Sequence, residues 1–141
     1  MRIGIPLEVA PGENRVAATP RTVTQLIGLG YDVLVESGAG ARAALPDAAF
    51  RESGAEIGTA AEAWGSDVVL AVNPPTDDQI AALNPGARLI AFLWPRQDAE
   101  LTERLAARGV TALSMDMVPR TSRAQALDAL SSMANISGYR A

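Results

Sequence analysis

The stretch that decides the fold is DVVLAV, residues 67–72, which is apolar at every position after the first. An uninterrupted apolar run of this length is typical of a strand that is buried on both faces of a sheet. The prolines in NPP, residues 73–75, end the strand, and Thr76 then provides an N-cap for a helix to about residue 83. A buried strand that leads directly into a helix indicates an α/β protein with a parallel sheet.

The rest of the chain repeats this alternation of apolar runs and helix-like segments. We expect further strands at residues 2–6, 31–36, 56–57, 88–93 and 110–114. We expect further helices at residues 20–30, 47–53, 59–64 and 98–108, and a last one that starts near Ser122. The pattern predicts an open, doubly wound, mostly parallel sheet of about five strands with helices on both faces.

The domain boundary is expected near the last helix. Residues 1–121 are predicted to form one α/β subdomain, and residues 122–141 the start of a long helix that leads to another subdomain. Gly138 is followed by Tyr139 and Arg140 and not by a turn, so that helix lacks a stop signal. We therefore expect the natural chain to continue past Ala141.

Composition excludes several functional classes. The chain has 141 residues and a formal net charge of -4, and its twelve positive charges are all arginines spread without a basic run, which argues against nucleic-acid binding. It contains no cysteine and no histidine, so we expect neither a zinc site nor a Ser-His-Asp triad. No apolar stretch approaches the roughly 20 residues of a membrane helix, which predicts a soluble polypeptide.

A glycine-rich motif, GAGARA at residues 38–43, matches the G-x-G-x-x-A fingerprint of dinucleotide-binding folds. In that fingerprint the third small residue lies inside a helix whose N-terminus receives the pyrophosphate. Here Pro46 interrupts the helix just after the motif, and the motif does not follow the first strand. We therefore interpret it as a small-residue loop.

Arg15 lies in the loop after the first strand, where ligands of open α/β sheets commonly bind. Its guanidinium is a candidate to hold an anion. The competing interpretation is that Arg15 pairs with Glu8 or Glu13, or faces solvent.

The most informative polar residues lie near the C-terminus. On a helix with about 100° per residue, a polar set falls within an arc of about 120°: Gln125, Asp128, Ser131, Ser132 and Asn135. Their amides, hydroxyls and single carboxylate suit an amide or a ribose. Arg120, just upstream, is placed to reach a phosphate or a carboxamide oxygen. A capped surface helix with Ser122 as its N-cap would explain the same pattern.

Several motifs together carry a family resemblance. They are residues 1–6, ENRVAATP at 13–20, VESGAG at 35–40, FLWP at 92–95 and SRAQALDALSSMANISGYRA at 122–141. In this collinear set the chain resembles the alpha subunit of bacterial proton-translocating NAD(P) transhydrogenase. The resemblance covers nearly the whole chain, and the last motif is the most specific.

The resemblance implies hydride transfer between NAD(H) and NADP(H), coupled to proton movement across a membrane. It implies that NAD is the cofactor, that a second subdomain of the same subunit carries the dinucleotide fingerprint, and that NADP lies on a partner component. Further implied partners are a membrane proton-channel component and a second copy in a homodimer, with a cytoplasmic location at the membrane. Carried over by motif, the nicotinamide-side residues are Arg120, Thr121, Ser122, Gln125, Asp128 and Ser131. No catalytic acid or base is implied, because hydride passes between the two cofactors.

Alanine dehydrogenase has the same fold and is the alternative. That family is similar at Arg15, where its arginine holds the substrate carboxylate, but it also uses a lysine and a histidine at the places of Asn73 and Trp94. The chain has neither lysine nor histidine anywhere, so the proton-transfer groups of amino-acid deamination are missing. A third hypothesis is a non-catalytic interaction module that docks through its last helix.

Overall fold

The computed structural model describes residues 1–140, and these form a six-stranded, entirely parallel sheet. The strands are β1 (Arg2–Ile5), β2 (Asp32–Glu36), β3 (Glu56–Gly58), β4 (Val68–Leu70), β5 (Arg88–Ala91) and β6 (Thr111–Ser114). Their order in the sheet is β3-β2-β1-β4-β5-β6. The predicted open, doubly wound α/β fold is confirmed. The sheet has one strand more than expected, because the short segment β3 pairs with β2 along all three of its residues.

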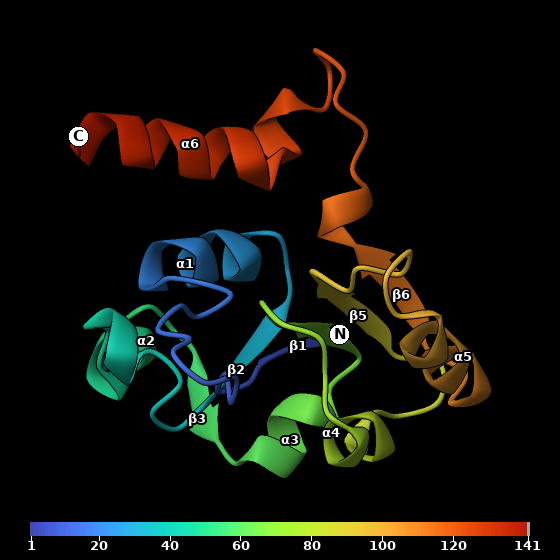
Figure 1. Cartoon of the computed structure of the whole chain (residues 1–141). Helices are drawn as coiled ribbons and strands as arrows, with labels where there is room; N and C mark the ends of the chain where they lie inside the picture. Colours follow the sequence, from blue (N-terminus) through green and yellow to red (C-terminus); the bar gives the residue numbers. More distant parts are fainter. Residues whose placement is uncertain (141) are drawn as a thin grey trace.

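Helices cover both faces of the sheet (Figure 1). Each face has its own hydrophobic core. On one face lie α1 (Pro20–Gly28) and α2 (Asp47–Glu52), whose Val23 and Phe50 pack with β1 and β2. On the other lie α3 (Ala60–Trp64), α4 (Asp77–Ala82) and α5 (Ala99–Ala107), whose apolar residues pack with β4 and β5. Because all six strands are parallel, the loop after each strand leaves from the same edge of the sheet, where the strands have their carboxyl ends.

Local sequence explains where these helices begin. Thr19 caps α1 and Pro20 occupies its first turn, where a missing N–H costs nothing. Thr59 and Thr76 form capping boxes with Glu62 and Gln79, the third residues of α3 and α4. Each threonine hydroxyl accepts the backbone N–H of that third residue, and the side chain of the third residue accepts the backbone N–H of the threonine. These caps stop each helix from running back into the preceding loop.

The close packing of α3 on the sheet depends on Gly4 in the central strand β1. A Cβ atom placed on Gly4 would lie 1.9 Å from the carbonyl oxygen of Ala63. Only a residue without a side chain allows the helix backbone to approach a central strand this closely.

The segment after β6 corrects the predicted position of the last helix. Residues Met115–Met117 and Gln125–Leu127 form single 3₁₀ turns, and α6 spans Ala129–Arg140. The helix does not begin near Ser122. Asp128 has an extended backbone, and its carbonyl accepts the first helical hydrogen bond from Ser132 N at 3.1 Å. Serine and aspartate are both favoured as N-caps, but here Asp128 and not Ser122 has that position. No helix in the described residues is long and apolar enough to cross a membrane.

Candidate functional site

Strand order places one crevice position at the border between β1 and β4. From β1 the chain continues to β2 on one side, and from β4 it continues to β5 on the other. In open α/β sheets, ligands bind outside the carboxyl ends of the strands at such a switch point. The loops after β1 and β4 are therefore the first place to look for a site.

A buried carboxylate joins those two loops. Glu8, in the loop after β1, is 6% exposed. One of its carboxylate oxygens accepts a hydrogen bond from Val72 N at 2.5 Å, and the other accepts from Asn73 N at 3.2 Å and Asn73 Nδ2 at 2.9 Å. Because these three hydrogen bonds join Glu8 to the backbone and side chain of residues after β4, Glu8 fixes the β4 loop to the β1 loop.

Arg15 is paired within the same network. Its Nε and Nη2 donate to the two carboxylate oxygens of Glu13 at 2.8 and 2.7 Å, and Asn73 Nδ2 also donates to Glu13 at 2.9 Å. The bonds from Arg15 come first among the causes that lower the pKa of Glu13 to about 2, and the same pair raises the pKa of Arg15. Of the two interpretations of Arg15, the structure shows the pairing with a nearby glutamate. An anion that bound Nε and Nη2 of Arg15 would have to displace Glu13.

The glycine-rich loop is likewise occupied by the chain itself. After Gly40 comes one 3₁₀ turn, Ala41–Ala43, and α2 begins only after Pro46. The carboxylate of Asp47 accepts from Gly38 N at 2.9 Å and from Ser37 Oγ at 2.8 Å, and these bonds lower its pKa. The motif therefore lies in a loop, as expected, with no long helix behind it and with its first amide already bonded.

The loops after β5 and β6 are tied together by Asp116. Its Oδ1 accepts from Leu93 N at 3.0 Å and Trp94 N at 3.1 Å, and also from the hydroxyl of Ser114. Burial raises the pKa of Asp116, but the Ser114 bond and the backbone N–H donors outweigh it, so the net pKa is lowered. The carboxylate is thus a fixed anionic acceptor at this end of the sheet.

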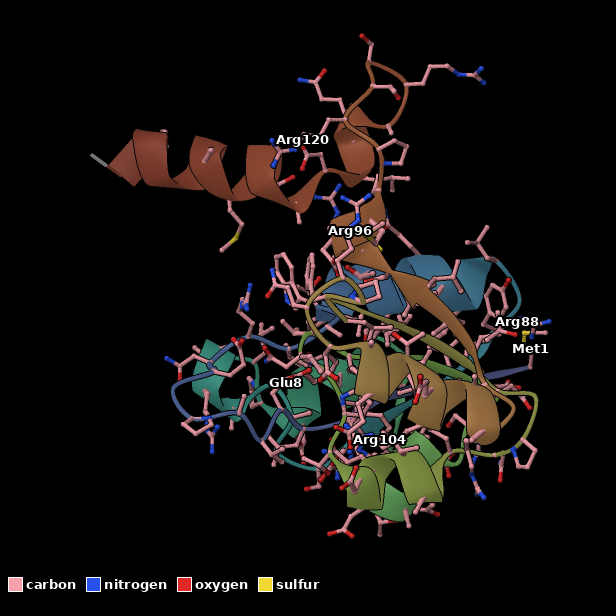
Figure 2. The ribbon with its side chains drawn as sticks, turned by 45° about the vertical axis from the view of Figure 1, so that its right-hand side comes forward. Met1, Glu8, Arg88, Arg96, Arg104 and Arg120 are labelled. Atoms are coloured by element: carbon pink, nitrogen blue, oxygen red, sulfur yellow. The ribbon has the colours of Figure 1, made fainter. Side chains whose placement is uncertain are left out.

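The residues expected to contact the nicotinamide all follow this tie. Arg120, Thr121, Ser122 and Gln125 are exposed along the segment between β6 and α6, and Asp128 is half-buried at its end. Figure 2 shows Arg120 in the excursion between β6 and α6, beyond the edge of the sheet. Ser131 lies in α6, and its side chain is outside the described part of the structure.

The prediction that the polar residues from Gln125 to Asn135 share one face of a single helix is therefore wrong. Gln125 belongs to a 3₁₀ turn and Asp128 to an extended residue, so only the later members share a helix. Sequence reasoning also gave no site role to Asp116 or Trp94. The position of both just after strands was the available signal. Among the described residues, no group of three acidic, histidine or cysteine side chains is arranged to hold a metal ion.

The family profile described as "Alanine dehydrogenase/PNT, N-terminal domain" matches residues 4–137. The chain belongs to this family. The whole chain is also 57% identical over 141 residues to a Haemophilus influenzae protein named NAD(P) transhydrogenase subunit alpha. The expected resemblance to transhydrogenase alpha subunits is thereby confirmed.

A solved structure and a more distant relative are also similar to the chain. A transhydrogenase crystal structure from Sinorhizobium meliloti superposes on all of the chain with a TM-score of 0.95 and 40% identity, and the chain covers 42% of it. Alanine dehydrogenase of Bacillus subtilis is 35% identical over 142 residues. The chain spans 28% of the length of the Haemophilus relative and 37% of the Bacillus relative, so it corresponds to one part of each.

Proposed function

We propose that the chain is the nicotinamide-side subdomain of the NAD(H)-binding component of a proton-translocating transhydrogenase. The observation that carries the proposal is the exposed polar segment from Arg120 to Gln125, which leaves the carboxyl edge of the sheet in a chain 57% identical to a transhydrogenase alpha subunit. That edge is where α/β folds bind their ligands.

The donor and acceptor groups of this segment fit a nicotinamide. Its carboxamide needs a donor for the carbonyl oxygen and an acceptor for the NH₂ group. Arg120 supplies donors, Gln125 supplies both kinds of group, and the carboxylate of Asp128 supplies acceptors. We propose that Thr121 and Ser122 in this segment, and Ser131 in α6, also contact the nicotinamide side of the cofactor.

The bound dinucleotide supplies the hydride chemistry, and the side chains act by orientation. Arg120 and Gln125 would hold the carboxamide of the bound dinucleotide by hydrogen bonds, and so orient the nicotinamide for hydride transfer. No residue needs to accept or donate a proton in this role. That agrees with a chain that has neither histidine nor cysteine.

The remaining parts of the site come from outside this chain. The chain covers 28% of the Haemophilus relative, and we propose that a following subdomain binds the pyrophosphate of NAD. An NADP(H)-binding component and a membrane component that conducts protons complete the enzyme. The subunit works as a homodimer on the cytoplasmic face of the membrane.

The test compares two neighbouring arginines in the intact alpha subunit. Arg120→Ala should weaken NADH binding about 10- to 100-fold, since a charge-assisted hydrogen bond contributes about 1.5–3 kcal/mol, and should slow hydride transfer to an NADP analogue. Arg123→Ala is the matched control, because Arg123 is also exposed in this segment, and should change both quantities less than twofold. Equal NADH affinity and equal transfer rates for Arg120→Ala and wild type would refute the assigned role.

Alanine dehydrogenase activity is disfavoured by the β1–β4 network. Arg15 already has a carboxylate partner in Glu13. The residue after β4 is Asn73, whose amide does not titrate and cannot transfer a proton. We therefore expect no alanine-dependent NADH formation by the intact protein.

An interaction-only role predicts instead that the isolated chain self-associates through α6. Sedimentation of the chain as a clean monomer would count against that role.

A further inference from the structure

Trp94 has a backbone conformation that is unusual for a large residue. Its φ is +51°, and Ala44 is the only other non-glycine residue with positive φ among residues 1–140. The conformation is held from both sides of the residue. Its N–H donates to Asp116 at 3.1 Å, and its carbonyl accepts from Gln97 N at 2.8 Å and Asp98 N at 3.1 Å. A bulky residue persists in this region only when its surroundings impose it.

The strained backbone does not bury the indole. Trp94 is 48% exposed, whereas Trp64, the other tryptophan of the chain, lies at the end of α3 and is 4% exposed. An indole usually stabilises a fold through the large apolar area that it buries. At Trp94 the fold holds the backbone in place while about half of the residue remains exposed.

Topology places this indole at the start of the polar segment. Ala91 of β5 is paired with Ser114 of β6, so both strands end at the same edge of the sheet. Trp94 follows three residues after the first strand, and Asp116 two residues after the second. Arg120 is four residues beyond Asp116, which limits its Cα to about 15 Å from that of Asp116.

We propose that the indole of Trp94 is a contact surface for the nicotinamide ring and that Asp116 is the positioning residue that holds it there. This rests on the proposed function, because the ring is that of the NAD(H) bound by the polar segment. Trp94 is then the flat apolar wall that the hydrogen-bonding residues of that segment lack.

The contact makes Trp94 selective for one redox state of the cofactor. The nicotinamide ring is a cation in NAD⁺ and is neutral in NADH. An indole face attracts a cation more strongly than it attracts a neutral ring, so it stabilises the oxidised form more. A side chain at this position would therefore adjust the ratio of the two affinities as well as their size.

The test is equilibrium binding of NAD⁺, NADH and ADP-ribose to the intact alpha subunit. Trp94→Ala should weaken NAD⁺ about tenfold and NADH about threefold, and it should leave ADP-ribose, which has no nicotinamide, unchanged. Trp94→Phe keeps an aromatic face, so its losses should be smaller in the same order. Leu113→Ala is the matched control, since Leu113 is also 48% exposed but lies within β6, and all three affinities should stay within twofold.

Each other result has a defined meaning. If the wild-type subunit binds NAD(H) and Trp94→Ala binds all three ligands as tightly, the Trp94 contact is refuted and the proposed function stands. Equal losses for ADP-ribose and NAD⁺ also refute the contact, because the loss is then not at the nicotinamide. If the wild-type subunit binds neither NAD⁺ nor NADH, the proposed function fails together with this inference.

The role of Asp116 is tested through Trp94. Asp116→Ala removes the acceptor of Trp94 N and one of the two acceptors of Leu93 N, whereas Asp116→Asn keeps an amide oxygen there. We expect Asp116→Ala to lower the ratio of NAD⁺ to NADH affinity as Trp94→Ala does, and Asp116→Asn to restore most of it. The double variant should show no larger loss than Trp94→Ala alone. Additive losses, or reduced thermal stability with an unchanged affinity ratio, would show that Asp116 is only structural.

Discussion

The replacement of Gly4 by alanine should destabilise the chain far more than one added methyl group ordinarily does. The new Cβ would lie 1.9 Å from the carbonyl oxygen and 2.8 Å from the carbonyl carbon of Ala63, and 2.7 Å from Ser66 Oγ. An ordinary carbon–oxygen contact needs more than 3.0 Å, so α3 must move away by about 1 Å. The obstacle is helix backbone, which has no rotamer through which to escape. Such overpacking costs typically 1–3 kcal/mol, and we expect about 3 kcal/mol here.

The assay is thermal and urea unfolding of the chain beside a matched glycine variant. For 140 residues the unfolding entropy is about 0.3 kcal/mol/K, so 3 kcal/mol lowers the Tm by about 10 °C. Gly28→Ala is the control, because a Cβ at Gly28, inside α1, meets nothing within 4 Å. It should leave stability unchanged or raise it by about 0.5–1 kcal/mol through the higher helix propensity of alanine. A Tm for Gly4→Ala within 3 °C of wild type would show that α3 does not lie as close to β1 as described.

Three further substitutions test contacts around the site and under it. The pKa of Glu13 is lowered from 4.5 to about 2, so the ionised carboxylate stabilises the fold fully above pH 4.5, and this effect is lost as pH falls through about 2. The difference in unfolding free energy between wild type and Glu13→Gln should be about 1–2 kcal/mol at pH 7 and should vanish near pH 2. This magnitude is reduced for solvent screening, because Arg15 is half-exposed. Arg108→Met should cost about 1–2 kcal/mol in urea unfolding, because it leaves the carbonyls of Ala81 and Leu83 at the end of α4 without their guanidinium donor. Thr76→Ala should cost about 1 kcal/mol in the same assay through loss of the α4 cap, and Thr76→Ser should restore most of it.

The fold was predictable because its signals are local. Runs such as 67–72 are apolar throughout, and threonine caps mark the helices that follow them. The expected helix and strand segments up to β6 match the structure within a few residues. The third strand was the weakest signal, since Glu56–Gly58 has only one large apolar residue and becomes a strand through pairing with β2. That pairing is a tertiary contact which no local pattern encodes.

The site was less predictable because two capping residues competed for one helix. Ser122 and Asp128 are both good N-caps, and the intervening residues RAQAL favour a helix. The structure starts α6 after Asp128, so the helical-wheel argument for Gln125 failed although the residues stay in one segment. The tie between Asp116 and Trp94 spans 22 residues and depends on strand order. A single sequence does not carry that information.

The centre and one end of the carboxyl edge of the sheet differ in how far their polar groups are already paired. At the β1–β4 border, Glu8 and Glu13 accept from the Asn73 amide, and Glu13 also occupies Nε and Nη2 of Arg15, so a ligand that needs these donors must displace a bound carboxylate. At the β5–β6 end, the ordered acceptor Asp116 fixes the backbone of an exposed indole. Preorganised groups that remain accessible lower the cost of binding, whereas groups that are already paired raise it. A ligand of this subdomain is therefore expected at the β5–β6 end, away from the topological switch point that the fold alone would indicate.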